Sequence, residues 1–86
     1  MKIVFRTELY GTFKDDVLAV QTDNCKLDIY QCYKLFGEYQ LRTKKSIQQG
    51  TRVATKKEYL SLLTKLTNEG KQIETVSTLR KINLAV

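Results

Sequence analysis

The sequence predicts an α+β fold, in which a small, mainly antiparallel sheet of three to five strands carries one or two helices packed on one face. Three observations predict this class. Apolar and polar residues alternate near the N-terminus, which is typical of a strand. A capped stripe of apolar residues at helical spacing follows in the second half of the chain. The length of 86 residues allows one hydrophobic core, so we expect a single domain over residues 1–86.

The first two elements are predicted to form an antiparallel hairpin. Residues 2–10 alternate with period two and contain β-branched and aromatic side chains, so they predict a strand. Gly11 indicates a bulge or bend, after which Phe13 is expected to continue the strand. A polar turn at 14–16 leads to residues 17–22, whose nearly continuous apolar character predicts a more buried second strand.

Residues 25–36 fit two interpretations. Gly37 stands where a helix would end. The apolar residues at helical spacing before it are Ile29, Cys32, Tyr33 and Phe36. An alternating strand is supported by an overlapping set: Leu27, Ile29, Tyr33 and Leu35. We favour the helix, and the strand stays open as the alternative.

The next segments predict short extended pieces. Residues 38–47 nearly alternate and indicate a strand, residues 48–50 (Gln-Gln-Gly) indicate a turn, and residues 52–54 predict a short strand or extended loop.

A helix over about 56–69 is predicted by its two ends. Thr55 and Glu58 form a capping box, apolar residues at helical spacing follow, and Gly70 suits the C-terminal end. Residues 71–79 predict a further strand, which alternation at Ile82, Leu84 and Val86 would extend or resume.

The net charge of +6 belongs to one segment, residues 39–57. This segment contains no Asp or Glu, whereas the nine basic residues elsewhere are matched by nine acidic ones. Clustered Lys and Arg raise the local potential and neutralise phosphates with release of counterions. Tyr39 could stack on an unpaired base. The predicted nucleic-acid-binding residues are Tyr39, Arg42, Lys44, Lys45, Arg52, Lys56 and Lys57.

Two other interpretations of the segment 39–57 stay open. A lysine-rich loop is often only a solvated face, and a basic face can also bind an acidic protein surface.

No cluster of residues indicates an active site, and we predict that the protein is not an enzyme. Histidine, the usual general base and the commonest metal ligand, is absent, so we expect neither a metal nor a cofactor. Asp15 and Asp16 are better explained by turn chemistry than by the Mg²⁺ site of a small nuclease. Cys25 and Cys32 stand seven residues apart, beyond disulfide reach on one helix or strand.

The unpaired cysteines and the lack of any run of 18 apolar residues predict a soluble cytoplasmic protein with no membrane association. In general character the chain resembles the small early proteins of tailed bacteriophages, since it is short, free of proline and begins a strand at Lys2. The resemblance implies a protein of the host cytoplasm that inhibits or redirects a host nucleic-acid machine or a host defence system.

These observations together predict a small basic regulatory protein that binds RNA or another single-stranded nucleic acid. The alternative is an inhibitor that binds an acidic or nucleic-acid-binding host protein, such as an enzyme or toxin, through its basic face. An exposed sheet edge would also permit a homodimer.

Overall fold

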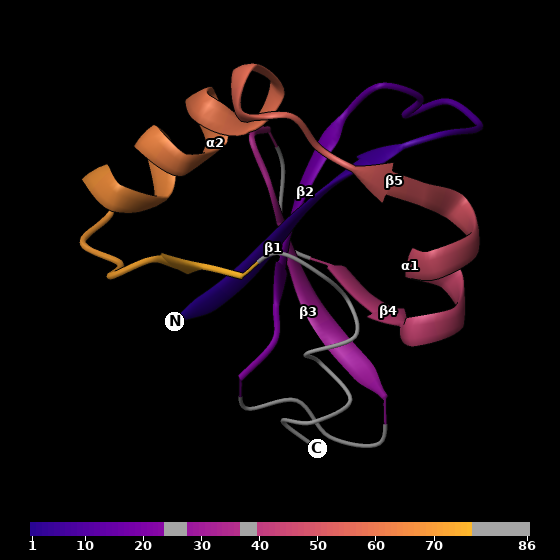
Figure 1. The fold of residues 1–86 in the computed structure, drawn as a ribbon, viewed down its shortest axis with the longest axis horizontal. Coiled ribbons are helices and arrows are strands. Elements are labelled where there is room, and N and C mark those ends of the chain that lie inside the picture. The colour runs from indigo at the N-terminus through magenta and orange to yellow at the C-terminus, as the bar shows by residue number, and fades with distance from the viewer. Residues whose placement is uncertain (24–27, 37–39, 77–86) are drawn as a thin grey trace.

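The computed structural model describes residues 1–23, 28–36 and 40–76. In these residues five strands form an open antiparallel sheet in the order β4-β3-β2-β1-β5. The strands are β1 (Lys2–Glu8), β2 (Val17–Gln21), β3 (Ile29–Lys34), β4 (Gln40–Thr43) and β5 (Thr51–Val53). A short strand, β6 (Glu74–Thr75), pairs in parallel with the start of β1. With α1 (Lys44–Gly50) and α2 (Lys56–Asn68), this arrangement confirms the predicted α+β class (Figure 1).

The predicted hairpin of β1 and β2 is confirmed, with Phe5 opposite Ala19 in the antiparallel register. Its turn is closed by the backbone N–H of Glu8, which donates to the carbonyl of Asp16 at 2.9 Å. Gly11 and Asp15 adopt positive φ angles of 84° and 73°, which Gly and Asp tolerate better than most residues. Phe13 therefore lies in the turn, and the expectation that it continues the strand is wrong.

The helix α2 packs on one face of the sheet. Its Leu62 and Leu66 are buried against the odd-numbered side chains of β1, Ile3 and Phe5. The Tyr59 ring stacks on the Phe5 ring with centroids 4.3 Å apart. Each apolar side chain removed from water here contributes about 1.5–3 kcal/mol.

The two ends of α2 follow the predicted signals. The Thr55 hydroxyl accepts from the N–H of Glu58, and the Glu58 carboxylate accepts from the N–H of Thr55, so the capping box is present. At the other end, Gly70 has a φ of 88°, and the N–H of Lys71 donates to the Leu66 carbonyl. These bonds satisfy backbone groups that a helix leaves unpaired.

The helix α1 covers the opposite face of the sheet. Ile47 is fully buried against even-numbered side chains of the strands, among them Val4, Val20 and Cys32. Since β4 and β5 are the two edges of the five-stranded path, the connection through α1 carries the chain from one edge to the other. The sheet is thus covered by a helix on each face, so the expectation that the helices pack on one face is wrong.

Residues 29–34 form β3, so the preference for a helix over residues 25–36 is wrong. Strand pairing decides the matter, because β3 is hydrogen-bonded to β2 on one side and β4 on the other. Tyr30 and Cys32 are fully buried, whereas Ile29 and Phe36 of the proposed helical stripe are exposed. Period two is therefore the pattern that burial selects. Cys25, Leu27 and Gly37 lie outside the described residues.

The structure also corrects residues 38–50. The predicted strand is present only at β4, and helix α1 begins at Lys44 and includes the predicted turn at 48–50. The helix starts here because the Thr43 hydroxyl caps it by accepting from the N–H of Ser46 at 3.1 Å. The short strand predicted near 52–54 is confirmed as β5.

The strand predicted over 71–79 is limited to β6 in the described part, and residues 77–86, with Ile82, Leu84 and Val86, lie outside it. Within residues 1–23, 28–36 and 40–76, no helix has the length and apolarity needed to cross a membrane.

Candidate nucleic-acid interface

The basic segment 39–57 does not form one continuous surface. It runs along the β4 edge, crosses one face of the sheet as α1, returns as β5 at the other edge and enters α2 on the second face. Its cations are therefore distributed over different parts of the molecule. Tyr39 lies outside the described residues.

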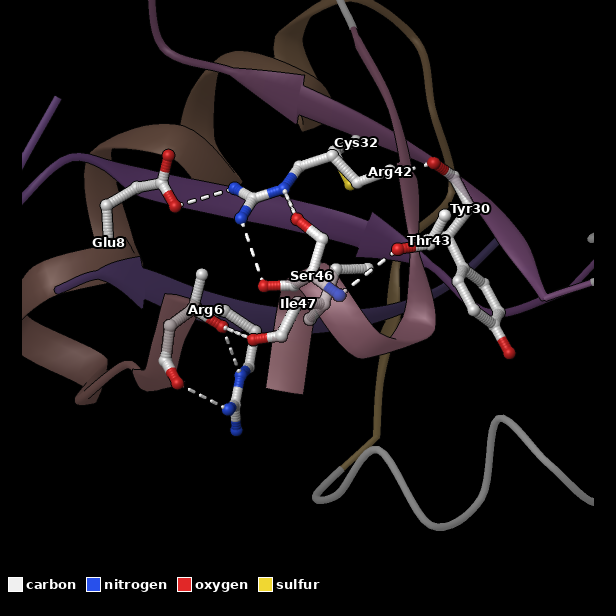
Figure 2. Close-up of polar contacts among 9 residues, drawn as sticks. Arg6, Glu8, Tyr30, Cys32, Arg42, Thr43, Ser46 and Ile47 are labelled. Atoms are coloured by element: carbon white, nitrogen blue, oxygen red, sulfur yellow. Dashed lines mark hydrogen bonds and ion pairs between the residues drawn. The ribbon is translucent and has the colours of Figure 1, made fainter. Parts of the chain in front are cut away.

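The guanidinium of Arg42 lies between Glu8 and Ser46 (Figure 2). Its Nη1 donates to Oε1 of Glu8 at 2.6 Å, its Nε donates to Oγ of Ser46 at 3.0 Å, and its Nη2 donates to the Ser46 carbonyl at 3.2 Å. The side chains of Arg42 and Glu8 are 14% and 11% exposed. This guanidinium joins β4, β1 and α1, so we assign it a structural role and remove it from the phosphate-binding set.

A second buried arginine, Arg6, holds the end of α1. Its Nε and Nη2 donate to the hydroxyl and carbonyl of Thr51 at 2.9 and 2.8 Å, and the Thr51 hydroxyl donates to the Ile47 carbonyl (Figure 2). Arg6 is only 8% exposed, and burial lowers the pKa of its guanidinium. Sequence reasoning missed this group, although an arginine at an inward position of a predicted strand is the available signal.

Arg52 is exposed but is held by an ion pair. Its Nη1 and Nη2 donate to the two carboxylate oxygens of Glu58 at 2.8 and 2.5 Å. The hydrogen bond from Arg52 and that from the Thr55 backbone lower the pKa of Glu58 to about 2. The same pair raises the pKa of Arg52. A phosphate would have to compete with a bidentate carboxylate for this guanidinium.

The remaining four predicted cations lie in two places. Lys45, next to the half-buried Lys44, is exposed in the first turn of α1, and Lys56 and Lys57 are exposed in the first turn of α2. Of the predicted set, the ammonium groups best presented to solvent are those of Lys45, Lys56 and Lys57. The two helices are on opposite faces of the sheet, so a short ligand would meet one group or the other.

Exposed aromatic side chains form a feature that the sequence did not predict. Tyr10 and Phe13 of the β1–β2 turn are 72% and 52% exposed, and Phe36, just after β3, is 81% exposed. The ammonium of Lys34 lies 3.7 Å from the centroid of the Phe13 ring, within cation–π distance. A break in the alternation at Gly11 was the one sequence signal that Phe13 leaves the sheet.

A cavity of about 240 Å³ lies at this end of the sheet. The β1–β2 turn, the end of β3 and the first turns of α2 form its walls. Its lining residues are Asp15, Asp16, Val17, Lys34, Leu35, Phe36, Glu58, Ser61 and Leu62. Since Glu58 belongs to this wall, Lys57 and Lys56 stand one and two residues away from it in the chain. Aromatic, basic and acidic groups thus meet at one end of the molecule.

Neither a metal site nor a reactive thiol is found among the described residues. No three His, Cys, Asp or Glu side chains in the described ranges gather as a metal ion would require. Cys32 is buried as a free thiol, and burial, with a smaller effect of Glu8, raises its pKa to about 12 against the lowering effect of Arg42. A thiol with so little thiolate character is a poor nucleophile at neutral pH.

Comparison with known proteins adds no functional assignment. No family model, no curated protein and no solved structure matches this chain.

Proposed function

We propose that the protein binds single-stranded nucleic acid, with RNA as the favoured form, through the end of the sheet that contains Phe13, Lys34 and Phe36. The observation that carries the proposal is the exposure of two phenylalanine side chains, Phe13, whose ring lies beside the Lys34 ammonium, and Phe36. Burying such rings is favourable in itself, so large exposed aromatic side chains indicate a binding surface.

The chemistry of this end suits an unpaired strand. Bases stack on exposed aromatic rings with little dependence on sequence, and each stacked base contributes about 1–3 kcal/mol. Phosphates between the bases need cations, which Lys34 supplies beside the rings and Lys56 and Lys57 supply at the start of α2. The net charge of +6 would also attract a polyanion at long range.

The test is binding of a fluorescein-labelled 12-mer of oligouridine, measured by anisotropy at low and high salt. We expect affinity that falls steeply with salt, because phosphate contacts release counterions. Phe36→Ala is expected to weaken binding about tenfold, the effect of one lost stacking contact.

Two charge-matched double variants locate the site. Lys56→Ala/Lys57→Ala removes two charges from α2, and Lys44→Ala/Lys45→Ala removes two from α1. We expect the α2 double variant to lose more affinity than the α1 double variant. Equal losses would show that only the overall charge matters. If Phe36→Ala binds the strand as tightly as the wild type, the stacking site is contradicted.

A second function, inhibition of a host protein, is favoured by a different surface. Leu41 of the edge strand β4 and Ile29 of the neighbouring β3 are exposed, outside the core that α2 covers. This edge could receive a protein partner, as expected for the phage-type inhibitor. Absence of RNA binding at low salt, together with a protein complex that survives nuclease treatment, would favour this function over the first.

A further inference from the structure

The cavity beside Phe36 differs from the rest of the proposed surface in its charge. The protein has a net charge of +6, yet the carboxylates of Asp15 and Asp16 line this cavity. Neither side-chain carboxylate accepts a hydrogen bond from the described residues, whereas Glu58 in the same wall accepts from Arg52 and Thr55. The pKa of Arg52 is raised chiefly by its hydrogen bond with Glu58 and in smaller part by the charge of Asp15. Two acceptor groups are therefore available at the cavity.

The other walls suit a flat ring. Val17, Leu35 and Leu62 supply apolar surface, and the exposed ring of Phe36 stands at the side. A volume of about 240 Å³ lies below the range of about 300–1,000 Å³ that is common for drug-sized ligands. The cavity therefore has room for one small planar group.

We propose that this cavity binds a single unstacked guanine base of the nucleic-acid strand, with Asp15 or Asp16 as the carboxylate that recognises it. The proposal rests on the proposed function and adds a base preference to it. An ionised carboxylate only accepts hydrogen bonds, and its two oxygens match a pair of adjacent donors.

Guanine is the base whose pairing edge presents such a pair, N1–H and the exocyclic amine. Adenine and cytosine present one amine beside a ring nitrogen acceptor, and uracil presents one N–H between two carbonyl acceptors. A carboxylate repels those acceptors, so they reduce the affinity of the other three bases. The same carboxylates repel phosphates, which would therefore lie toward the cations, Lys34 of the cavity wall and Lys57 at the start of α2.

The experiment compares five labelled 12-mers: oligouridine and the same strand with one central guanine, adenine, cytosine or inosine. Inosine keeps N1–H but lacks the exocyclic amine. We expect the guanine strand to bind about tenfold more tightly than oligouridine, the size of one bidentate base contact. Inosine is expected to lose most of this advantage.

The variant Asp15→Asn/Asp16→Asn tests the carboxylates directly. Asn tolerates the positive φ of residue 15, so the turn should remain intact, which the unfolding transition checks. We expect the ratio of the affinity for the guanine strand to the affinity for oligouridine to fall toward one. The affinity for oligouridine itself should not change. Glu69→Gln/Glu74→Gln is the charge-matched control, because it also removes two negative charges. Both residues are exposed and neither lines the cavity, since Glu69 lies at the C-terminal end of α2 and Glu74 pairs with Lys2 at the far end of β1.

The two proposals fail in different ways. Equal binding of all five strands, or a guanine preference that persists in the double variant, would overturn the guanine site and leave the proposed function standing. Absence of binding by every strand at low salt would overturn both.

Discussion

Arg42 and Lys57 carry the same charge and stand in the same basic segment, but their surroundings differ. The Arg42 guanidinium donates hydrogen bonds to Glu8 and Ser46, whereas the Lys57 side chain is exposed at the start of α2. Arginine can fill such an internal role because its planar fork donates in several directions at once. A count of basic residues therefore overstates the charge that this chain can offer to a ligand.

We predict that Glu8→Gln destabilises the fold by about 3 kcal/mol, because it leaves the largely buried guanidinium of Arg42 without a counter-charge. Urea unfolding followed by circular dichroism measures the loss. The double variant Glu8→Leu/Arg42→Met should recover part of it, since no unpaired charge remains. If the loss in this double variant equals the sum of the losses in Glu8→Leu and Arg42→Met measured singly, the coupling between the two side chains is contradicted.

The Cys32 thiol is predicted to be unreactive in the folded protein. Burial raises its pKa to about 12, so a Cys25→Ser variant should react with a thiol reagent at pH 8 only after unfolding. Because the folded pKa is raised above the ordinary value of 9.0, this thiol contributes stability that is present below that value and is lost as the pH rises toward 12. Rapid labelling of native protein would contradict the buried position.

Among the elements, α2 combines local signals with packing. Its capping box, its C-terminal glycine and its apolar stripe all indicate the same helix, so the sequence alone predicts it closely. β3 shows the opposite case, because its residues satisfy both periods and only pairing with β2 and β4 selects the strand. α1 is seven residues long and could not be predicted from periodicity.

At the start of α2, we predict a dependence of stability on acid pH. The pKa of Glu58 is lowered to about 2 by Arg52 and the Thr55 backbone, so the stability it contributes is present above its ordinary pKa of 4.5 and is lost as the pH falls toward 2. Unfolding transitions of wild type and Glu58→Gln at pH 6, 4 and 2.5 measure this. The difference between the two proteins should shrink as the pH falls, and a constant difference would contradict it.

For the whole molecule, the decisive feature is that the sheet has a helix on each face. The sequence predicted the α+β fold class and the long helix α2. It could not predict where the basic segment 39–57 lies in the fold, because this segment runs along both edges and across both faces of the sheet. The candidate site changed for this reason. Lys56 and Lys57 stay in it, Arg42 leaves it, and the exposed rings of Phe13 and Phe36 enter it through contacts between segments distant in sequence.

The position of β1 has a consequence for folding during synthesis. β1 is made well before the partners on one of its sides, β5 and β6, which begin at Thr51 and Glu74. A nascent chain can form the β1–β2 hairpin early, while the other backbone edge of β1 stays unpaired until these segments have left the ribosome. Contacts of such long sequence separation slow folding. We therefore expect the native sheet to form only after β5 and β6 have been translated, with an exposed strand edge until then.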